Sequence, residues 1–166
     1  MTLKLGIIGA GRIGRVHADT LVTRVPSAEV VAIADIYESS AKSAAETYHI
    51  PDYTTDPSEL IRSSGIDAVV ICSSTDTHNQ FIVESAQAGK QIFCEKPISF
   101  DLNEIDGALK IVEEEGVKLQ IGFNRRFDSN HIRLKQAIEQ GEIGTQHILS
   151  IISRDPAPPP IEYIKV

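Results

Sequence analysis

Three glycines near the N-terminus have a spacing that suits a phosphate-binding turn. The residues Gly9, Ala10, Gly11, Arg12, Ile13 and Gly14 form a G-x-G-x-x-G pattern between an apolar run of strand length and a segment with helical spacing. In such a turn the first glycine permits the tight bend, the second lets the backbone approach a pyrophosphate, and the third allows close packing of helix on strand. An ordinary strand-to-helix turn without a ligand is the alternative, so the weight of the pattern depends on its context.

An acidic residue ends the second apolar run, where a dinucleotide fold needs one. Asp35 lies roughly 20 positions beyond Gly14, where a carboxylate accepts hydrogen bonds from the adenosine ribose. Its charge would repel the 2′-phosphate of NADP, and the following Ile36 and Tyr37 supply no compensating arginine. The sequence therefore predicts NAD rather than NADP. The alternative is a carboxylate that only serves the N-terminus of the helix near Ser39.

Polar residues also follow two later apolar runs. Ser73, Ser74 and Thr75 follow the run 68–72, and their hydroxyls could line the path of the cofactor or simply cap the next helix. His78, just beyond them, is equally well explained as a structural histidine of that helix, and His17 is expected to be structural on the first helix.

Glu95, Lys96 and Pro97 follow the run 91–94. A lysine after a strand is usually a solvated surface charge. Here, however, Pro97 biases Lys96 toward an extended backbone and allows a cis bond, so its side chain could be held in a fixed direction. Lys96 is therefore a candidate catalytic cation.

The elements that must position these residues alternate regularly. Short apolar runs occur at 3–8, 30–34, 68–72, 91–94 and 118–121, and segments with helical spacing lie between them at 12–22, 39–48, 77–88 and 102–115. Runs without in-out alternation, joined by helices, predict parallel strands that are covered on both faces. The predicted fold is α/β, a doubly wound parallel sheet of the Rossmann type. Helix boundaries are indicated by Asp56-Pro57, Gly89 and Asp101.

Composition narrows the function classes. The 166 residues carry a formal net charge of −7 without a basic stripe, which argues against a nucleic-acid partner. No apolar run approaches the ~20 residues that span a bilayer, and no signal-peptide pattern opens the chain, so we expect a cytoplasmic protein without a membrane partner. Cys72 and Cys94 have no metal-ligand spacing, so no metal site is predicted, and both are expected to be buried as small apolar residues.

The character of the sequence changes after Gly122. A polar, arginine-containing segment leads into a helical stretch to about Gln140, then an expected strand at 146–153, and a tail with Pro156 and Pro158 to Pro160. These elements do not complete a domain. We therefore expect a dinucleotide-binding domain at 1–122 and, at 123–166, the beginning of an incomplete C-terminal domain for substrate binding and oligomerisation.

Taken together, these residues resemble the Gfo/Idh/MocA oxidoreductases over almost the whole chain. The similarity rests on the glycine-rich turn Gly9 to Gly14, Asp35, the segment Ser73 to His78, and Glu95-Lys96-Pro97. Within the family, the segments Gly122 to Asp128 and Ser153 to Pro156 are most similar to the inositol 2-dehydrogenases. The resemblance implies NAD-dependent oxidation of a secondary hydroxyl of a cyclic polyol, and a homo-oligomer when the protein is full length.

The resemblance also implies roles for individual residues. Lys96 would contact the reacting hydroxyl, Asn124 and Arg125 would border the polyol, and Glu95 would lie near the nicotinamide. The general base would be one of an Asp and a His beyond the end of this chain, so the chain alone is expected to be inactive. Two alternatives remain open: a non-catalytic module that binds or senses NAD(H), and the same chemistry on another sugar or a dihydrodiol.

Overall fold

The computed structural model describes residues 2–154 and residue 157, and it divides into two units, Met1–Phe123 and Asn124–Val166. The first contains a six-stranded sheet with the order β3-β2-β1-β4-β5-β6, in which every pair of neighbours is parallel. Its strands are β1 (Leu3–Ile8), β2 (Ala28–Ala34), β3 (Asp52–Thr54), β4 (Ala68–Ile71), β5 (Gln91–Cys94) and β6 (Leu119–Ile121).

The strand order explains the apolar runs of the sequence. The central strands are covered by helices on both faces, and all four residues of β4 are buried. The predicted Rossmann-type sheet is confirmed, because this strand order reverses direction between β1 and β4 as in a doubly wound dinucleotide-binding fold. The edge strand β3 was not predicted, because its three residues include no apolar run and two of them are exposed.

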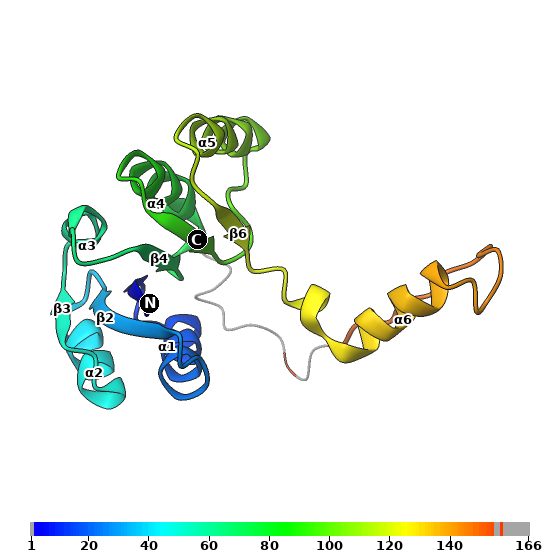
Figure 1. Cartoon of the computed structure of the whole chain (residues 1–166), viewed down its shortest axis with the longest axis horizontal. Helices are drawn as coiled ribbons and strands as arrows, with labels where there is room; N and C mark the ends of the chain where they lie inside the picture. Colours follow the sequence, from blue (N-terminus) through cyan, green and yellow to red (C-terminus); the bar gives the residue numbers. More distant parts are fainter. Residues whose placement is uncertain (1, 155–156, 158–166) are drawn as a thin grey trace. The chain divides into compact units, whose positions relative to one another are not determined.

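Helices cover both faces of this sheet (Figure 1). On one face, α1 (Arg12–Arg24) and α2 (Glu38–Tyr48) contribute Ala18, Ala44 and Ala45 to a core with Ile7 and Ile33. The other face is covered by α3 (Pro57–Arg62), α4 (Thr75–Gln87) and α5 (Leu102–Glu114), whose buried side chains form a second core with Ile8 and Ile71. The sheet is thus held rigidly between two apolar layers, and its strand ends are fixed points.

The helix boundaries follow the predicted signals. The side chains of Asp56 and Asp101 accept hydrogen bonds from the amides of Ser58 and Asn103, so each caps the helix that follows it. Gly89 follows the end of α4 with a φ of +70°, a conformation that favours glycine.

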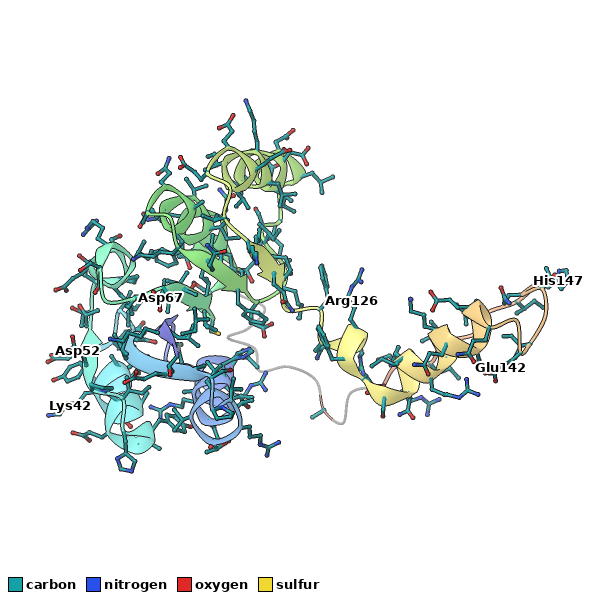
Figure 2. All side chains as sticks on the ribbon, viewed as in Figure 1. Lys42, Asp52, Asp67, Arg126, Glu142 and His147 are labelled. Carbon is teal, nitrogen blue, oxygen red and sulfur yellow. The ribbon has the colours of Figure 1, made fainter. Side chains whose placement is uncertain are left out.

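The second unit contains a 3₁₀ helix, η1 (Asn124–Phe127), and α6 (Ser129–Glu139). Asp128 caps α6 by accepting from the amides of Asn130 and His131, and no residue of α6 is buried. Arg133 donates two hydrogen bonds to Glu142 just beyond the helix, at 3.1 and 2.6 Å. Figure 2 marks Arg126 in η1 and Glu142 after α6. The predicted helical stretch is confirmed.

The prediction of a strand at 146–153 is wrong. In the part of the chain that the structure describes, residues 146–154 form neither helix nor strand. A strand needs a neighbour for its backbone hydrogen bonds, and these residues pair with no other strand in the part of the chain that the structure describes. The expectations for Asp155, Pro156 and Pro158 to Pro160 lie outside the described residues. Among those described, no helix is long and apolar enough to cross a membrane.

Candidate cofactor-binding and catalytic site

The predicted site residues of the first unit follow four parallel strands. Gly9 follows β1, Asp35 follows β2, Ser73 comes two residues after the end of β4, and Glu95 follows β5. Because parallel strands point the same way, their carboxyl ends meet at one edge of the sheet, which is where ligands bind in open α/β folds. The structure therefore brings these positions to a common edge.

Two glycines of the first turn are required by space. Gly9 has a φ of +100°, and a Cβ atom there would lie 2.6 Å from the carbonyl oxygen of Cys72. A Cβ atom on Gly14 would lie 1.8 Å from the carbonyl oxygen of Gly9, where no side chain fits. Gly11 differs, because its Cβ would meet no atom within 4 Å. The open space beside Gly11 leaves the backbone accessible to a ligand.

The N-terminus of α1 lies directly in this turn. Gly11 is its N-cap residue, no side chain caps the helix, and no acidic residue lies in its first turn. The first amides of the 13-residue helix, from Arg12 to Gly14, thus have no side-chain acceptor at the cap, and the helix dipole adds a positive potential. This end of α1 can bind an anion such as a pyrophosphate.

Asp35 holds the turn in place. One carboxylate oxygen accepts from the amide of Ala10 at 2.7 Å, and the other accepts from the amide of Tyr37 at 2.9 Å. The carbonyl oxygen of Ala10 accepts from Nε of Arg15 at 3.1 Å, so the Ala10 residue is held through both its amide and its carbonyl. A carboxylate has about four acceptor sites, so capacity for a ribose hydroxyl remains. The bond to Tyr37, the N-cap residue of α2, agrees with the structural alternative for Asp35, whereas the sequence did not indicate the bond to Ala10.

The polar segment after β4 lies mostly in the first turn of α4, which begins at Thr75. Ser73 lies before it, and its hydroxyl accepts from Thr77 Oγ1 at 2.7 Å. Ser74 is the N-cap residue but makes no side-chain capping bond.

His78 is 2% exposed, and its two ring nitrogens lie 2.7 Å from the carbonyl oxygen of Pro97 and 3.0 Å from that of Ser73. Neutral imidazole has one N–H, so it donates to one of these oxygens, and only the cation donates to both. His78 thus ties the turn after β4 to the turn after β5.

The turn after β5 presents Lys96 to solvent. The Lys96–Pro97 bond is cis, and the Lys96 side chain is exposed. Its amide donates to Oε2 of Glu95 at 3.3 Å, while Oε1 of Glu95 lies 2.8 Å from Nε2 of His17 on α1. The sequence offered no signal for this second contact, because 78 positions separate the two residues.

The two cysteines lie near Glu95. Cys94 is fully buried, as predicted, whereas Cys72 is only partly buried. Burial, with a smaller contribution from the negative charge of Glu95, raises the pKa of the Cys94 thiol to about 12 and raises that of Cys72 still further. Both thiols are therefore unreactive near neutral pH.

Asn124 and Arg125 belong to η1 in the second unit, and both are exposed. Their predicted contact with a polyol stays a prediction. The two described hollows, of about 430 and 710 Å³, both include Lys4, Gly65 and Ile66, and neither includes the glycine-rich turn, Asp35 or Lys96. Among the residues described, no three His, Cys, Asp or Glu side chains gather to bind a metal.

Comparison with known proteins agrees with this arrangement. The chain is 50% identical over 160 residues to the uncharacterised oxidoreductase YrbE of Bacillus subtilis. The alignment covers 96% of this chain and 47% of YrbE. It is 44% identical over 164 residues to the myo-inositol 2-dehydrogenase of Thermotoga maritima, and this alignment covers 99% of the chain and 49% of that enzyme. The chain thus spans about half the length of the curated relatives it matches.

Solved structures give the same result. A probable dehydrogenase of Thermotoga maritima superposes with a TM-score of 0.94 at 44% identity, covering 98% of this chain and 49% of that one. The scyllo-inositol dehydrogenase of Lactobacillus casei, solved with NAD(H) and scyllo-inositol, gives a TM-score of 0.83 at 33% identity. This superposition covers 87% of the present chain and 43% of that enzyme. Residues 3–123 match the Gfo/Idh/MocA model, described as an oxidoreductase family with an NAD-binding Rossmann fold. The chain belongs to the Gfo/Idh/MocA family of oxidoreductases.

Proposed function

We propose that this chain binds NAD(H) and forms the cofactor-binding part of a dehydrogenase that oxidises a secondary hydroxyl of a cyclic polyol such as myo-inositol. The observation that carries the proposal is that a turn suited to an anion and a lysine follow strand ends at one edge of the sheet. The glycine-rich turn and Asp35 suit a dinucleotide, and Lys96 follows a neighbouring strand end. Relatives whose names specify inositol dehydrogenases support the choice of polyol.

The residues around the turn fit the cofactor. A Cβ atom at Gly9 or Gly14 would collide with backbone, whereas the space beside Gly11 is open, as a backbone that approaches a pyrophosphate requires. The N-terminal amides of α1 would hold the phosphates. Asp35 would accept from the ribose and disfavour a 2′-phosphate.

Lys96 supplies the charge that the reaction needs. NAD, when bound, accepts the hydride that leaves the carbinol carbon. Negative charge then develops on the hydroxyl oxygen, and the ammonium of Lys96 would stabilise it. A cation cannot also accept the hydroxyl proton, so we assign that proton to an Asp and His pair in the half of the relatives that this chain does not span.

Calorimetric titration of the chain with NADH and with NADPH tests the cofactor. We expect NADH to bind at least about tenfold more tightly, because Asp35 repels the extra phosphate. Circular dichroism of the same sample is the control for folding. A folded chain that binds neither dinucleotide, or that prefers NADPH, would contradict the proposal.

The polyol can be tested in a full-length version that spans the length of the relatives. Formation of NADH is followed with myo-inositol, scyllo-inositol, glucose and a dihydrodiol, and we expect an inositol to be the best substrate. Lys96→Met removes the charge at nearly constant length and should lower kcat by roughly 10²- to 10³-fold. Lys42→Met, at an exposed lysine of α2, is the matched control and should leave kcat unchanged. Turnover of the dihydrodiol alone would overturn the polyol assignment.

A further inference from the structure

We propose that His17 is a positioning residue, which acts through Glu95 to hold the turn that carries Lys96 against α1. The inference rests on the proposed function in one respect, that Lys96 is the residue to be positioned for catalysis. The N-terminus of α1 is the predicted pyrophosphate site. The hydrogen bond between His17 and Glu95 therefore links the part of the site that binds the cofactor to the part that carries the catalytic cation.

The geometry of His17 is fixed from two sides. Its Nε2 atom lies 2.8 Å from Oε1 of Glu95, and the two side chains are only 26% and 21% exposed. Because an ionised carboxylate has only acceptors, Nε2 carries the proton and donates it. The ring also meets Phe93 of β5 edge-on, with centroids 5.0 Å apart and an interplanar angle of 61°. This aromatic contact orients the ring toward Glu95.

The carboxylate of Glu95 has a defined place as well. A Cβ atom on Gly122 would lie 3.1 Å from Cδ and from both carboxylate oxygens, so the carboxylate fills the space that a side chain would need. Oε2 accepts from the backbone amide of Lys96 at 3.3 Å. One carboxylate oxygen of Glu95 thus accepts from His17 on α1, and the other accepts from the backbone amide of Lys96.

The groups around this carboxylate do not compete for it. Burial, with a smaller contribution from the charge of Glu95, raises the thiol pKa values of Cys72 and Cys94, so both stay uncharged near neutral pH. The ring of Phe93 is apolar. A hydrogen bond to a charged group in such partly buried surroundings is stronger than one in water. The bond between His17 and Glu95 can therefore hold the turn.

Two substitutions separate positioning from general stability. His17→Phe keeps a ring against Phe93 but removes the donor, whereas His17→Gln keeps an N–H donor of similar reach. In the 166-residue chain, we expect His17→Phe to move the NMR resonance of the Lys96 amide and to speed its hydrogen exchange by at least about threefold. His17→Gln should largely restore both, and the Ala10 amide, held by Asp35, is the internal control.

Activity of the full-length version gives the second measurement. His17→Phe should lower kcat by about tenfold, a loss of about 1.4 kcal/mol in transition-state stabilisation, while the KM for NAD changes by less than about twofold. Adding Glu95→Gln should cause little further loss, because both changes break the same link. His17→Gln should recover most of the rate.

The inference is overturned if His17→Phe leaves the Lys96 amide unchanged, or if His17→Gln fails as fully as His17→Phe in both measurements. A loss of kcat that only parallels a lower Tm would also overturn it. If the full-length version oxidises no polyol, the proposed function fails by itself. The amide of Lys96 would still decide whether His17 controls the turn.

Discussion

The glycine-rich turn after β1 and the Glu95-Lys96-Pro97 turn after β5 are built in opposite ways. The first is formed by consecutive residues, Gly9 to Gly14, and works because side chains are absent where backbone and ligand must approach. The second is held by side chains from distant segments, with His17 contacting Glu95 and His78 contacting Pro97. Adding atoms should therefore damage the first turn most, and removing polar groups should damage the second.

Gly14→Ala should have the largest effect, because its Cβ would lie 1.8 Å from a backbone oxygen that cannot rotate away. We expect a loss of roughly 3 kcal/mol or more in unfolding free energy and no detectable NADH binding. Urea unfolding and calorimetry measure the two effects. Gly11→Ala is the matched control, and it should cost about 1 kcal/mol or less because its Cβ meets no atom. Equal stability of the two variants would contradict the comparison.

Asp35→Ala removes one of the two side-chain contacts that hold Ala10 in the first turn. The amides of Ala10 and Tyr37 would lose their acceptor, at a cost of about 1–3 kcal/mol, and NADH affinity should fall at least about tenfold. If Asp35 serves only the backbone, stability falls but the folded fraction binds NADH as before. Asp52→Ala is the control at an exposed carboxylate that bonds only the adjacent Tyr53 amide, and it should change neither quantity.

Gly122→Ala adds one atom to the second turn and should have a smaller effect. The added Cβ would meet the far end of the Glu95 side chain at 3.1 Å, and that side chain can shift by a few tenths of an ångström. We expect a loss of about 1 kcal/mol together with a moved Lys96 amide resonance. Gly107→Ala in α5, where a Cβ meets no atom, should instead stabilise the protein by about 0.5–1 kcal/mol. A shift of the Lys96 amide in the Gly107 variant would argue against a local cause.

Titration of the Cys94 thiol should have the smallest effect near neutral pH, and its effect should become visible only at high pH. Its thiol pKa is about 12 in the folded protein, against an ordinary value of 9.0, so the unfolded chain loses its proton first. Stability from this group is therefore complete below about pH 9 and is lost as the pH rises toward about 12. Urea unfolding across this range should show a shallower decline in Cys94→Ala than in the wild type. Identical pH dependence in both would contradict the prediction.

Features formed by consecutive residues could be predicted from the sequence, whereas contacts between distant segments could not. The sheet, five of its strands and the glycine-rich turn depend on apolar runs and on glycine spacing, which are local features of the chain. The contact of His17 with Glu95 could not be predicted, because it exists only once α1 and β5 pack together. The edge strand β3 was missed because its short, largely exposed sequence carries no apolar signal.

The expected strand at 146–153 failed for the converse reason. Its apolar residues Ile148, Leu149, Ile151 and Ile152 are a local signal, but a strand forms only when another strand satisfies its backbone. Ile148 is 91% exposed in the structure, which shows that this apolar segment has no covering layer among the described residues. A local pattern thus predicts an element only where the rest of the fold supplies its partner.

The double attachment of Ala10 has a kinetic consequence. Its amide donates to Asp35 and its carbonyl accepts from Arg15, so the side chains of the protein hold the turn in one shape. Little chain entropy is then lost when a dinucleotide arrives, and association needs no rearrangement of the loop. Stopped-flow mixing with NADH should give a single fast phase whose rate rises linearly with concentration. Discrimination against NADPH would then lie in how quickly the cofactor leaves.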